Sequence, residues 1–393
     1  MGRRCRILML FLVSLFFAFV VFLQELVEND VSQVDSSHLL LPTSRVRFIV
    51  VQTRFSHGWC RMLASAILSN VSVEILGYGR KYKHVDRLFW VMEYIEKEKL
   101  RDSDVVVVYD GSDTLISGAS TVQRAVDRFI ATTAPTPDAF DAAAVRRGVA
   151  TAPVLFSAEA NCYHPQLTNN VKWGVSKGRC ISAYWRAYGY WAEGCCDFAQ
   201  NKKIRLHYLN AGGYVARVWA LKQAFGAYRD LLQQKRWWCD QSVWGLVYLW
   251  SITQDPRMTP DVRIPRGLIN LDFHNTFFFS LHSMRFEKDI LFWSSTAIAD
   301  VAAGGRLPFP LFFGIVDSPN ATPAILHFNG LGRNVRFYVE RMQNHTSWYV
   351  ETKRSAAAFL KARDILQGQA LIKVYSVDDG KVAPYSHFCP VFF

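Results

Sequence analysis

The 393-residue chain lacks the clustered basic residues and the signatures that mark nucleic-acid-binding proteins. Its net charge is +12, from 45 Lys and Arg against 33 Asp and Glu, but the basic residues are scattered. No helix-turn-helix, zinc-finger or RNA-binding pattern is present, so we expect no nucleic-acid partner. The basic excess still suits other anionic partners, such as membrane headgroups or phosphorylated ligands. Hydrophobic residues make up 50%, which excludes disorder by composition.

The cysteines lack the spacing of a structural zinc site, because the chain has neither a C-x-x-C nor an H-x-x-x-H pattern. Seven of the eight cysteines lie beyond residue 23, and four of these cluster between residues 162 and 196. An oxidising compartment would convert them into disulfides. The odd number leaves at least one without an intramolecular partner, and the sequence does not assign the pairs.

The N-terminal region lacks an A-x-A-like cleavage site after its apolar run at residues 7–23. This run, near the lower length limit for a spanning helix, follows a basic segment at 1–6 and belongs to a cleaved signal peptide or a signal anchor. The missing cleavage site favours the uncleaved signal anchor. The positive-inside rule then predicts a single-pass type II membrane protein of the endoplasmic reticulum or Golgi, with a stem at 24–44 and a lumenal domain. Sequons at Asn70, Asn320 and Asn344 support a lumenal location.

Buried strands alternate with amphipathic helices after the stem, which predicts a doubly wound α/β fold. We expect strands at 47–53, 71–76, 105–109, 154–159, 210–216 and 324–327, with residues 206–209 leading into the fifth. We expect helices at 58–70, 86–100, 120–132, 218–234 and 240–249. A Pro/Ala-rich loop is expected at 133–152, and the last sixty residues read as peripheral helix and strand. The Cys- and aromatic-rich stretch at 161–205 gives no clear pattern.

Two aspartates, Asp110 and Asp113, follow the valine run Val105–Val108, with Gly111 between them. In open α/β sheets, ligands bind at the carboxyl ends of strands. Two carboxylates in that position can hold a hard divalent cation that also grips a diphosphate. The alternative is a simple turn, because Asp, Gly and Ser are common turn residues.

Several short motifs follow one another in an order found in a known family. They are Val51-Gln-Thr53, Leu76-Gly-Tyr-Gly79, Arg87 with Trp90, Asp110-Gly-Ser-Asp113, Phe156-Ser-Ala-Glu159, Leu209-Asn-Ala-Gly-Gly213, Asp240-Gln241, Leu271-Asp272 and His327-Phe-Asn-Gly330 followed by Arg333. Over roughly residues 45–340, this ordered set resembles the glycosyltransferase domain of the procollagen lysyl hydroxylases, the lysyl hydroxylase/glycosyltransferase family.

The resemblance implies a GT-A fold, an α/β/α sandwich that binds a UDP-sugar and Mn²⁺. It implies one catalytic domain at 45–345, with a C-terminal extension at 346–393 packed on it. By motif match, the metal ligands would be Asp110, Asp113 and His327. The donor side would be formed by Thr53, Arg87, Asn210, Gly212, Asn329, Gly330 and Arg333. The candidate catalytic residues are Glu159, Asp240 and Gln241.

Each of these residues also has a structural interpretation. His327 alone fits a hydrogen-bonded core histidine, Asp240 fits a helix N-cap, and Glu159 fits a partner of a nearby arginine. The pair Trp237-Trp238 and Tyr163 read as packing, and the alternative is that an aromatic, Tyr163 by the resemblance, stacks on an acceptor ring. The stretch between Glu159 and Asn210 is longer than is usual in the family, so we expect a rebuilt acceptor side.

These observations predict a metal-dependent hexosyltransferase that moves glucose or galactose from a UDP-sugar to a protein or glycan hydroxyl in the secretory pathway. Two alternatives stay open at this point. One is a catalytically inactive lumenal binding protein that keeps the fold. The other is a nucleotide-sugar hydrolase, in which water replaces the acceptor.

Overall fold

The structure, a computed structural model, describes residues 44–165, 177–192, 206–234, 236–254, 264–293, 312–318, 320–330, 335–369, 371–376 and 380–389. These residues belong to one unit that extends from Ser44 to Phe393. The expected cytoplasmic tail, the anchor and all of the stem except Ser44 lie outside the described residues, as does Arg333. No helix in the described part of the chain combines the length and the apolar character needed to span a bilayer.

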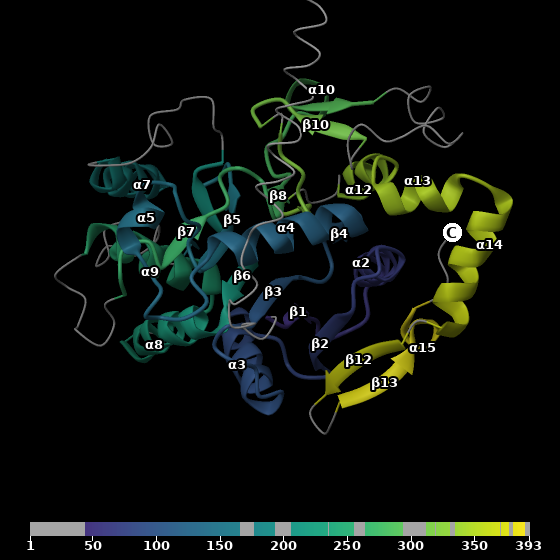
Figure 1. Ribbon diagram of the computed structural model, residues 1–393, viewed down its shortest axis with the longest axis horizontal. Coiled ribbons are helices and arrows are strands. Elements are labelled where there is room, and N and C mark those ends of the chain that lie inside the picture. The colour runs from purple at the N-terminus through teal and green to yellow at the C-terminus, as the bar shows by residue number, and fades with distance from the viewer. Residues whose placement is uncertain are drawn as a thin grey trace, which may run out of the picture. The chain divides into compact units, whose positions relative to one another are not determined.

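A mixed eight-stranded sheet lies at the centre, in the order β13-β12-β2-β1-β3-β6-β5-β7 (Figure 1). Its strands are β1 (Val46–Val51), β2 (Val73–Tyr78), β3 (Val105–Asp110), β5 (Val154–Glu159), β6 (Tyr208–Arg217), β7 (Ile269–Leu271), β12 (Leu371–Ser376) and β13 (Gly380–Pro384). β1 pairs in parallel with β2 and β3, and β5 pairs in parallel with β7. β6 runs antiparallel to β3 and β5, so its first residues lie beside the carboxyl ends of both strands.

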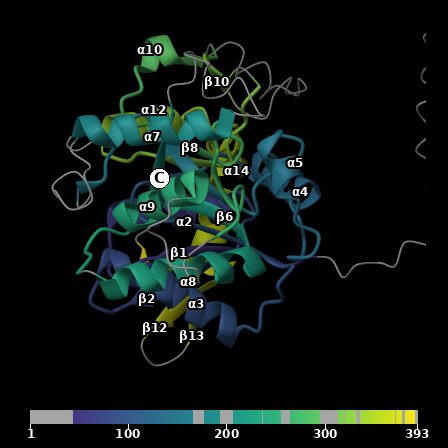
Figure 2. The ribbon, with the colours of Figure 1, turned by 90° about the vertical axis from the view of Figure 1, so that its left-hand side faces the viewer.

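The valine run of β3 is buried on both faces of the sheet because helices cover both. Val106 and Val108 belong to one core, with side chains of α3 (Arg87–Lys97), α8 (Val218–Gln234) and α9 (Asp240–Thr253). Val105 and Val107 belong to the other core, with side chains of α2 (His57–Leu68) and α4 (Ala119–Thr132). This alternation is what the two-residue period of a strand requires. Figure 2 shows α3 and α8 next to each other.

A second, three-stranded sheet is formed by β4 (Thr114–Ile116), β11 (Ile325–His327) and β8 (Phe278–Ser280), with β11 in the middle. β4 follows β3 after the Gly111 turn and pairs antiparallel with β11. A two-stranded sheet joins β9 (Ile290–Phe292), which follows the short helix α10 (Phe286–Asp289), to β10 (Phe313–Ile315). The three-stranded sheet therefore links the end of β3 to a segment more than two hundred residues later in the chain.

The C-terminal region contributes a strand to the central sheet. After α12 (Val335–Gln343), α13 (Ser347–Lys353) and α14 (Ala356–Asp364), β12 pairs in parallel with β2, and β13 forms the edge of the sheet. Figure 1 shows these two strands in yellow beside β2. After α15 (Tyr385–Phe388), Cys389 forms a disulfide with Cys60 of α2. The extension expected at 346–393 thus completes the sheet rather than only covering it.

The α/β class predicted from the sequence is confirmed, and the mixed sheet with helices on both faces is compatible with a Rossmann-like α/β/α sandwich. One loop differs from expectation, and one stretch without a clear pattern contains a helix. The loop expected at 133–152 contains the short helix α5 (Ala142–Arg146), which begins because the Asp141 carboxylate accepts hydrogen bonds from two backbone N–H groups. The stretch 161–205 contains helix α7 (Lys177–Ala192).

The disulfide between Cys60 and Cys389 closes a loop with a sequence separation of 329 residues. Replacing both cysteines by serine is expected to lower the free energy of unfolding by about 2–5 kcal/mol, because the open chain gains conformational entropy when it unfolds. Urea unfolding under non-reducing conditions measures this change. Cys60→Ser and Cys389→Ser alone should each match the double variant, since each opens the same bond. Additive effects of the two single variants would contradict the pairing.

Candidate metal centre and its surroundings

The two aspartates of the sequence motif lie where β3 ends and the chain turns towards β4. Gly111 fits this turn because any side chain would collide with its neighbours: an added Cβ would lie 2.6 Å from Gln52 Oε1 and 2.7 Å from Val50 Cγ1. The hydroxyl of Thr114 donates a hydrogen bond to the Asp110 backbone oxygen. The turn is therefore tightly packed, and it directs both carboxylates to the carboxyl end of the sheet.

His327 reaches the aspartates through strand pairing. In the register of β4 and β11, Thr114 lies opposite His327, and the Phe328 N–H donates to the Asp113 backbone oxygen over 2.8 Å. The distances from His327 Nε2 are 3.7 Å to Asp110 Oδ2 and 3.5 Å to Asp113 Oδ2. Two residues of one loop and one residue of a distant strand thus form a single cluster.

Gly212 of β6 leaves the space that this cluster occupies. A Cβ at this position would overlap the imidazole ring of His327 and lie 2.8 Å from Asp110 Oδ2. The backbone N–H of Gly212 donates to Asn210 Oδ1 over 2.9 Å, which fixes the local course of the strand. The resemblance placed Asn210 and Gly212 near the donor, and in the structure they form a wall of the candidate metal centre.

The charges of the cluster depend on one another. Burial alone would lower the pKa of His327, but the neighbouring carboxylates of Asp113 and Asp110 raise it above its usual value. Burial would raise the pKa of Asp113, yet His327 holds it low, whereas burial keeps the pKa of Asp110 raised despite the nearby Arg87. Neither ring nitrogen of His327 has a hydrogen-bond partner among the described residues, although the side chain is buried.

This donor set fits a divalent metal ion. The candidate ligand atoms of Asp110, Asp113 and His327 all lie within 4.8 Å of one another. Carboxylate oxygen and imidazole nitrogen are ligands that Mn²⁺ and similar ions accept. Buried polar atoms normally have a partner, and the two ring nitrogens of His327 depart from that rule. A metal ion would give the ring the partner it lacks.

Arg87 connects the metal centre to the start of α9. Its guanidinium lies 2.5 Å from Asp110 Oδ1 and 3.3 Å from Asp240 Oδ2, and the side chain is buried. Burial alone would lower the pKa of Arg87, but Asp110, Tyr82 and Asp240 together raise it. Burial raises the pKa of Asp240, and Arg87 opposes that rise. The arginine expected on the donor side is thus the cation shared by the half-buried carboxylate of Asp110 and the buried carboxylate of Asp240.

Glu159 lies at the end of β5 and is bound by two side-chain amides. Gln241 Nε2 donates to Glu159 Oε1 and Asn329 Nδ2 donates to Glu159 Oε2, each over 2.7 Å. Burial raises the pKa of Glu159 to about 7, although hydrogen bonds from Asn210, Gln241 and Asn329 act in the opposite direction. Among the described residues, side-chain amides rather than an arginine therefore bind the two oxygens of Glu159.

Of the other predicted site residues, the structure describes Thr53, Gly330 and Asp240. Thr53 follows β1, and its backbone oxygen accepts from the Gly79 N–H over 2.9 Å. Gly330 has φ +65 and would bring a side chain onto the ring of His282, so this turn requires glycine. Asp240 is the first residue of α9, and Cys239 is its N-cap, so the N-cap interpretation of Asp240 is wrong by one position. Arg333 lies outside the described residues.

The aromatic candidates Trp237, Trp238 and Tyr163 differ in how far they are exposed to solvent. Trp237 is buried and donates its indole N–H to the Leu231 backbone oxygen, as expected for packing. Trp238 and Tyr163 are 53% and 52% exposed. The packing interpretation therefore holds for only one of the two tryptophans. Tyr163 lies beside the site, because its backbone oxygen accepts a hydrogen bond from Gln241 Nε2 over 2.8 Å.

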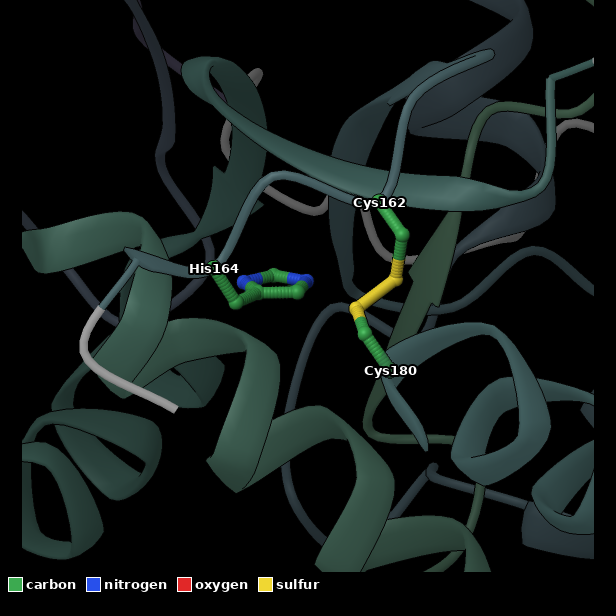
Figure 3. A group of neighbouring side chains, drawn as sticks. All are labelled: Cys162, His164 and Cys180. Atoms are coloured by element: carbon green, nitrogen blue, oxygen red, sulfur yellow. A yellow bond between two sulfur atoms is a disulfide. The ribbon is translucent and has the colours of Figure 1, made fainter. Parts of the chain in front are cut away.

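A second cluster, of Cys162, His164 and Cys180, also brings possible metal ligands together (Figure 3). The two cysteines are joined as a disulfide, so their sulfurs are not thiolate ligands in this structure. Both ring nitrogens of His164 have partners, Gln241 O at 3.0 Å and Tyr184 Oη at 2.9 Å. This structural role of His164 was not predicted, since its partners lie 20 and 77 residues away in the sequence.

Gly212→Ala is expected to abolish any rise in melting temperature that Mn²⁺ causes, because the new Cβ would displace His327 and Asp110. Thermal unfolding with and without Mn²⁺ measures this effect. Gly226→Ala is the matched control: it lies in α8 with open space around its Cβ, and the change should stabilise the helix by about 1 kcal/mol while keeping the metal response. A full metal response in the Gly212→Ala variant would exclude this site.

Glu159→Gln is expected to change the pH dependence of stability. The pKa of Glu159 in the folded protein is about 7 and its usual value is 4.5, so the folded state binds its proton more tightly. The protonated Glu159 therefore contributes to the free energy of unfolding below pH 4.5, and this contribution is lost as the pH rises through 7. The wild type should therefore lose about 3 kcal/mol relative to the variant over that range. Urea unfolding in EDTA at pH 4.5 and 8 tests this, and a pH-independent difference would contradict it.

The comparisons with known proteins do not assign a family. No protein-family model matches the chain. A search of curated proteins found no matching sequence. The resemblance to the lysyl hydroxylase/glycosyltransferase family therefore stays a prediction from the ordered motifs. The geometry of Asp110, Asp113 and His327 is an independent observation, since it comes from strand pairing and distances rather than from similarity.

Proposed function

We propose that the protein is a metal-dependent hexosyltransferase with a GT-A fold. It transfers glucose or galactose from a UDP-sugar to a glycan or protein hydroxyl in the lumen of the secretory pathway, and residues 7–23 anchor it in the membrane. One observation carries this proposal: Asp110, Asp113 and His327 converge at the carboxyl end of β3. Ligands of open α/β sheets bind at that end of the strands.

Under this proposal, Asp110, Asp113 and His327 hold Mn²⁺. When bound, the ion acts as a Lewis acid that neutralises the charge of the diphosphate leaving group. Arg87 supplies a buried positive charge next to Asp110 and suits the same diphosphate, because a guanidinium binds phosphate oxygens in pairs. Thr53 and Gly79, which are hydrogen-bonded to each other through their backbones, belong to the nucleotide side.

Glu159, Gln241 and Asp240 are the proposed catalytic residues. Glu159 suits the exchange of a proton with an acceptor hydroxyl, because its pKa of about 7 allows both protonation states near neutral pH. Its two amide partners fix the orientation of the carboxylate. Asp240 is held by Arg87 and by the Gln241 backbone N–H, so its position is fixed as well. The acceptor itself is a glycan or a protein side chain.

Asp113→Ala and His327→Ala are expected to lower Mn²⁺-dependent release of UDP about 100-fold or more, because each removes a ligand of the ion that stabilises the leaving group. The assay follows UDP release from UDP-glucose, UDP-galactose and UDP-N-acetylglucosamine, with Mn²⁺ or EDTA. Asp127→Ala, which changes an exposed carboxylate of α4, is the matched control and should keep wild-type activity.

The same assay separates the alternatives. UDP release that no sugar or protein acceptor accelerates would favour a nucleotide-sugar hydrolase. Binding of UDP and Mn²⁺ without turnover of any donor would favour a binding protein. Full activity in the Asp113→Ala variant would show that this cluster is not the metal site of the reaction.

A further inference from the structure

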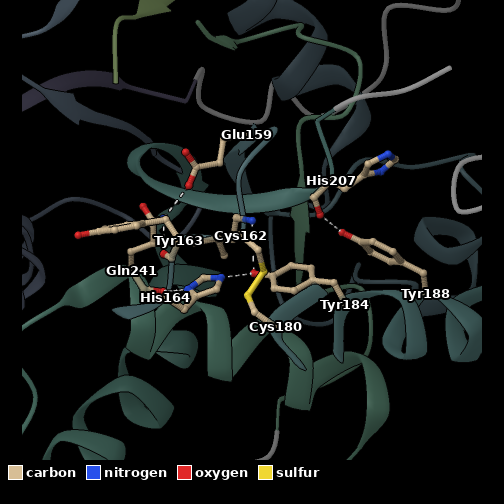
Figure 4. The surroundings of a disulfide bond; sticks show 10 residues. Glu159, Cys162, Tyr163, His164, Cys180, Tyr184, Tyr188, His207 and Gln241 are labelled. Carbon is tan, nitrogen blue, oxygen red and sulfur yellow. Dashed lines mark hydrogen bonds between the residues drawn. A yellow bond between two sulfur atoms is a disulfide. The ribbon is translucent and has the colours of Figure 1, made fainter. Parts of the chain in front are cut away.

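The segment that follows Glu159 is attached to two helices. Cys162 forms a disulfide with Cys180 of α7, and the side chain of His164 lies between α7 and α9 (Figure 4). The imidazole packs directly on the backbone of α9 at Gly245, where an added Cβ would overlap the ring. A glycine at position 245 thus allows His164 to lie against the helix that begins with Asp240 and Gln241.

The hydrogen bonds of His164 define its tautomer. The Gln241 backbone oxygen can only accept, so Nδ1 carries the proton and donates to it over 3.0 Å. Nε2 then accepts from the Tyr184 hydroxyl over 2.9 Å, and that hydroxyl accepts from the Leu209 N–H over 3.3 Å. Burial lowers the pKa of His164 to about 4, so the ring is neutral at physiological pH, as this chain of bonds requires.

The hydrogen bonds that pass through His164 lead at both ends to residues of the candidate site. Leu209 precedes Asn210 in β6, and Gln241 is the residue that binds Glu159. Gln241 is also held from its other sides: its Nε2 donates to the Tyr163 backbone oxygen over 2.8 Å, and its Oε1 accepts from the Ala211 N–H over 3.1 Å. Tyr163 and His164 therefore bind the side chain and the backbone of the same glutamine.

We propose that His164 is a positioning residue of the candidate site. Its neutral imidazole links α7, β6 and the first turn of α9, and thereby holds the Gln241 side chain against Glu159. The kinetic part of this inference rests on the proposed function, whereas the placement of Gln241 does not. Residues 161–165 and α7 would thus support the candidate site from the side of Gln241.

Three variants separate the two hydrogen bonds of the ring. Asparagine can place an N–H near the position of Nδ1, so His164→Asn should keep the bond to Gln241 O and lose the one to Tyr184. Glutamine reaches the position of Nε2, so His164→Gln should keep only the bond to Tyr184. His164→Ala removes both bonds. A positioning role through Gln241 predicts that the asparagine variant stays close to wild type in both measurements that follow.

The first measurement is hydrogen–deuterium exchange of peptides that contain Ala211, because the Ala211 N–H donates to the Gln241 side chain. We expect about tenfold faster exchange there in His164→Ala and His164→Gln, and near wild-type exchange in His164→Asn. Tyr385→Phe is the control: it removes one buried hydrogen bond, to the Cys60 backbone oxygen, and should leave exchange at Ala211 unchanged. Wild-type exchange at Ala211 in the alanine variant would overturn the proposal.

The second measurement is Mn²⁺-dependent UDP release. The turnover number should fall about tenfold in the alanine and glutamine variants and recover with asparagine, while the apparent affinity for Mn²⁺ stays the same. The affinity should not change because the hydrogen-bond partners of the His164 ring are Gln241 and Tyr184 rather than any of the three candidate metal ligands. An asparagine variant as impaired as the alanine variant would overturn the positioning role. Absence of UDP release by the wild type would contradict the proposed function, and exchange at Ala211 would still decide the role of His164.

Discussion

The concentration of negative charge is the constraint on which the site depends. Asp110, Asp113, Asp240 and Glu159 lie in one region at the carboxyl end of the sheet, and their charges influence one another and His327. Burying carboxylates is costly unless they are paired or bound to a cation. Arg87 is shared by Asp110 and Asp240, and the imidazole of His327 lies 3.5 Å from Asp113. The proposed divalent ion would supply the charge that these groups require.

Local patterns in the sequence predicted the elements of the fold better than their arrangement. The helix at 218–234 and the strand at 154–159 begin and end where they were expected, because apolar periodicity reports burial within each segment. The antiparallel direction of β6 and the pairing of β12 with β2 were not predicted. Both depend on contacts between segments that lie far apart in the chain. The hydrophobic period of a single segment carries no information about such contacts.

In the site, too, the residues were predicted better than the contacts between them. Asp110, Asp113 and His327 were predicted through motif order, and strand pairing brings them together. The shared contacts of Arg87, the amide pair around Glu159 and the bridge through His164 were not predicted. Each is a side-chain contact between elements whose relative positions the motifs do not contain. Asp240 shows the limit of local reasoning, since its residue type fits an N-cap but Cys239 has that position.

Asp113 and Glu159 differ in the direction in which the protein shifts their pKa values. His327 holds the pKa of Asp113 low, which suits its proposed role as a ligand that must be ionised to bind a cation, whereas burial raises the pKa of the neighbouring Asp110. Burial raises the pKa of Glu159 to about 7, which suits the proton exchange proposed for it near neutral pH. Acids whose environments separate their pKa values in this way commonly have separate roles. Because Gln241 and Asn329 bind Glu159, the segments that position these two amides determine the orientation of its carboxylate.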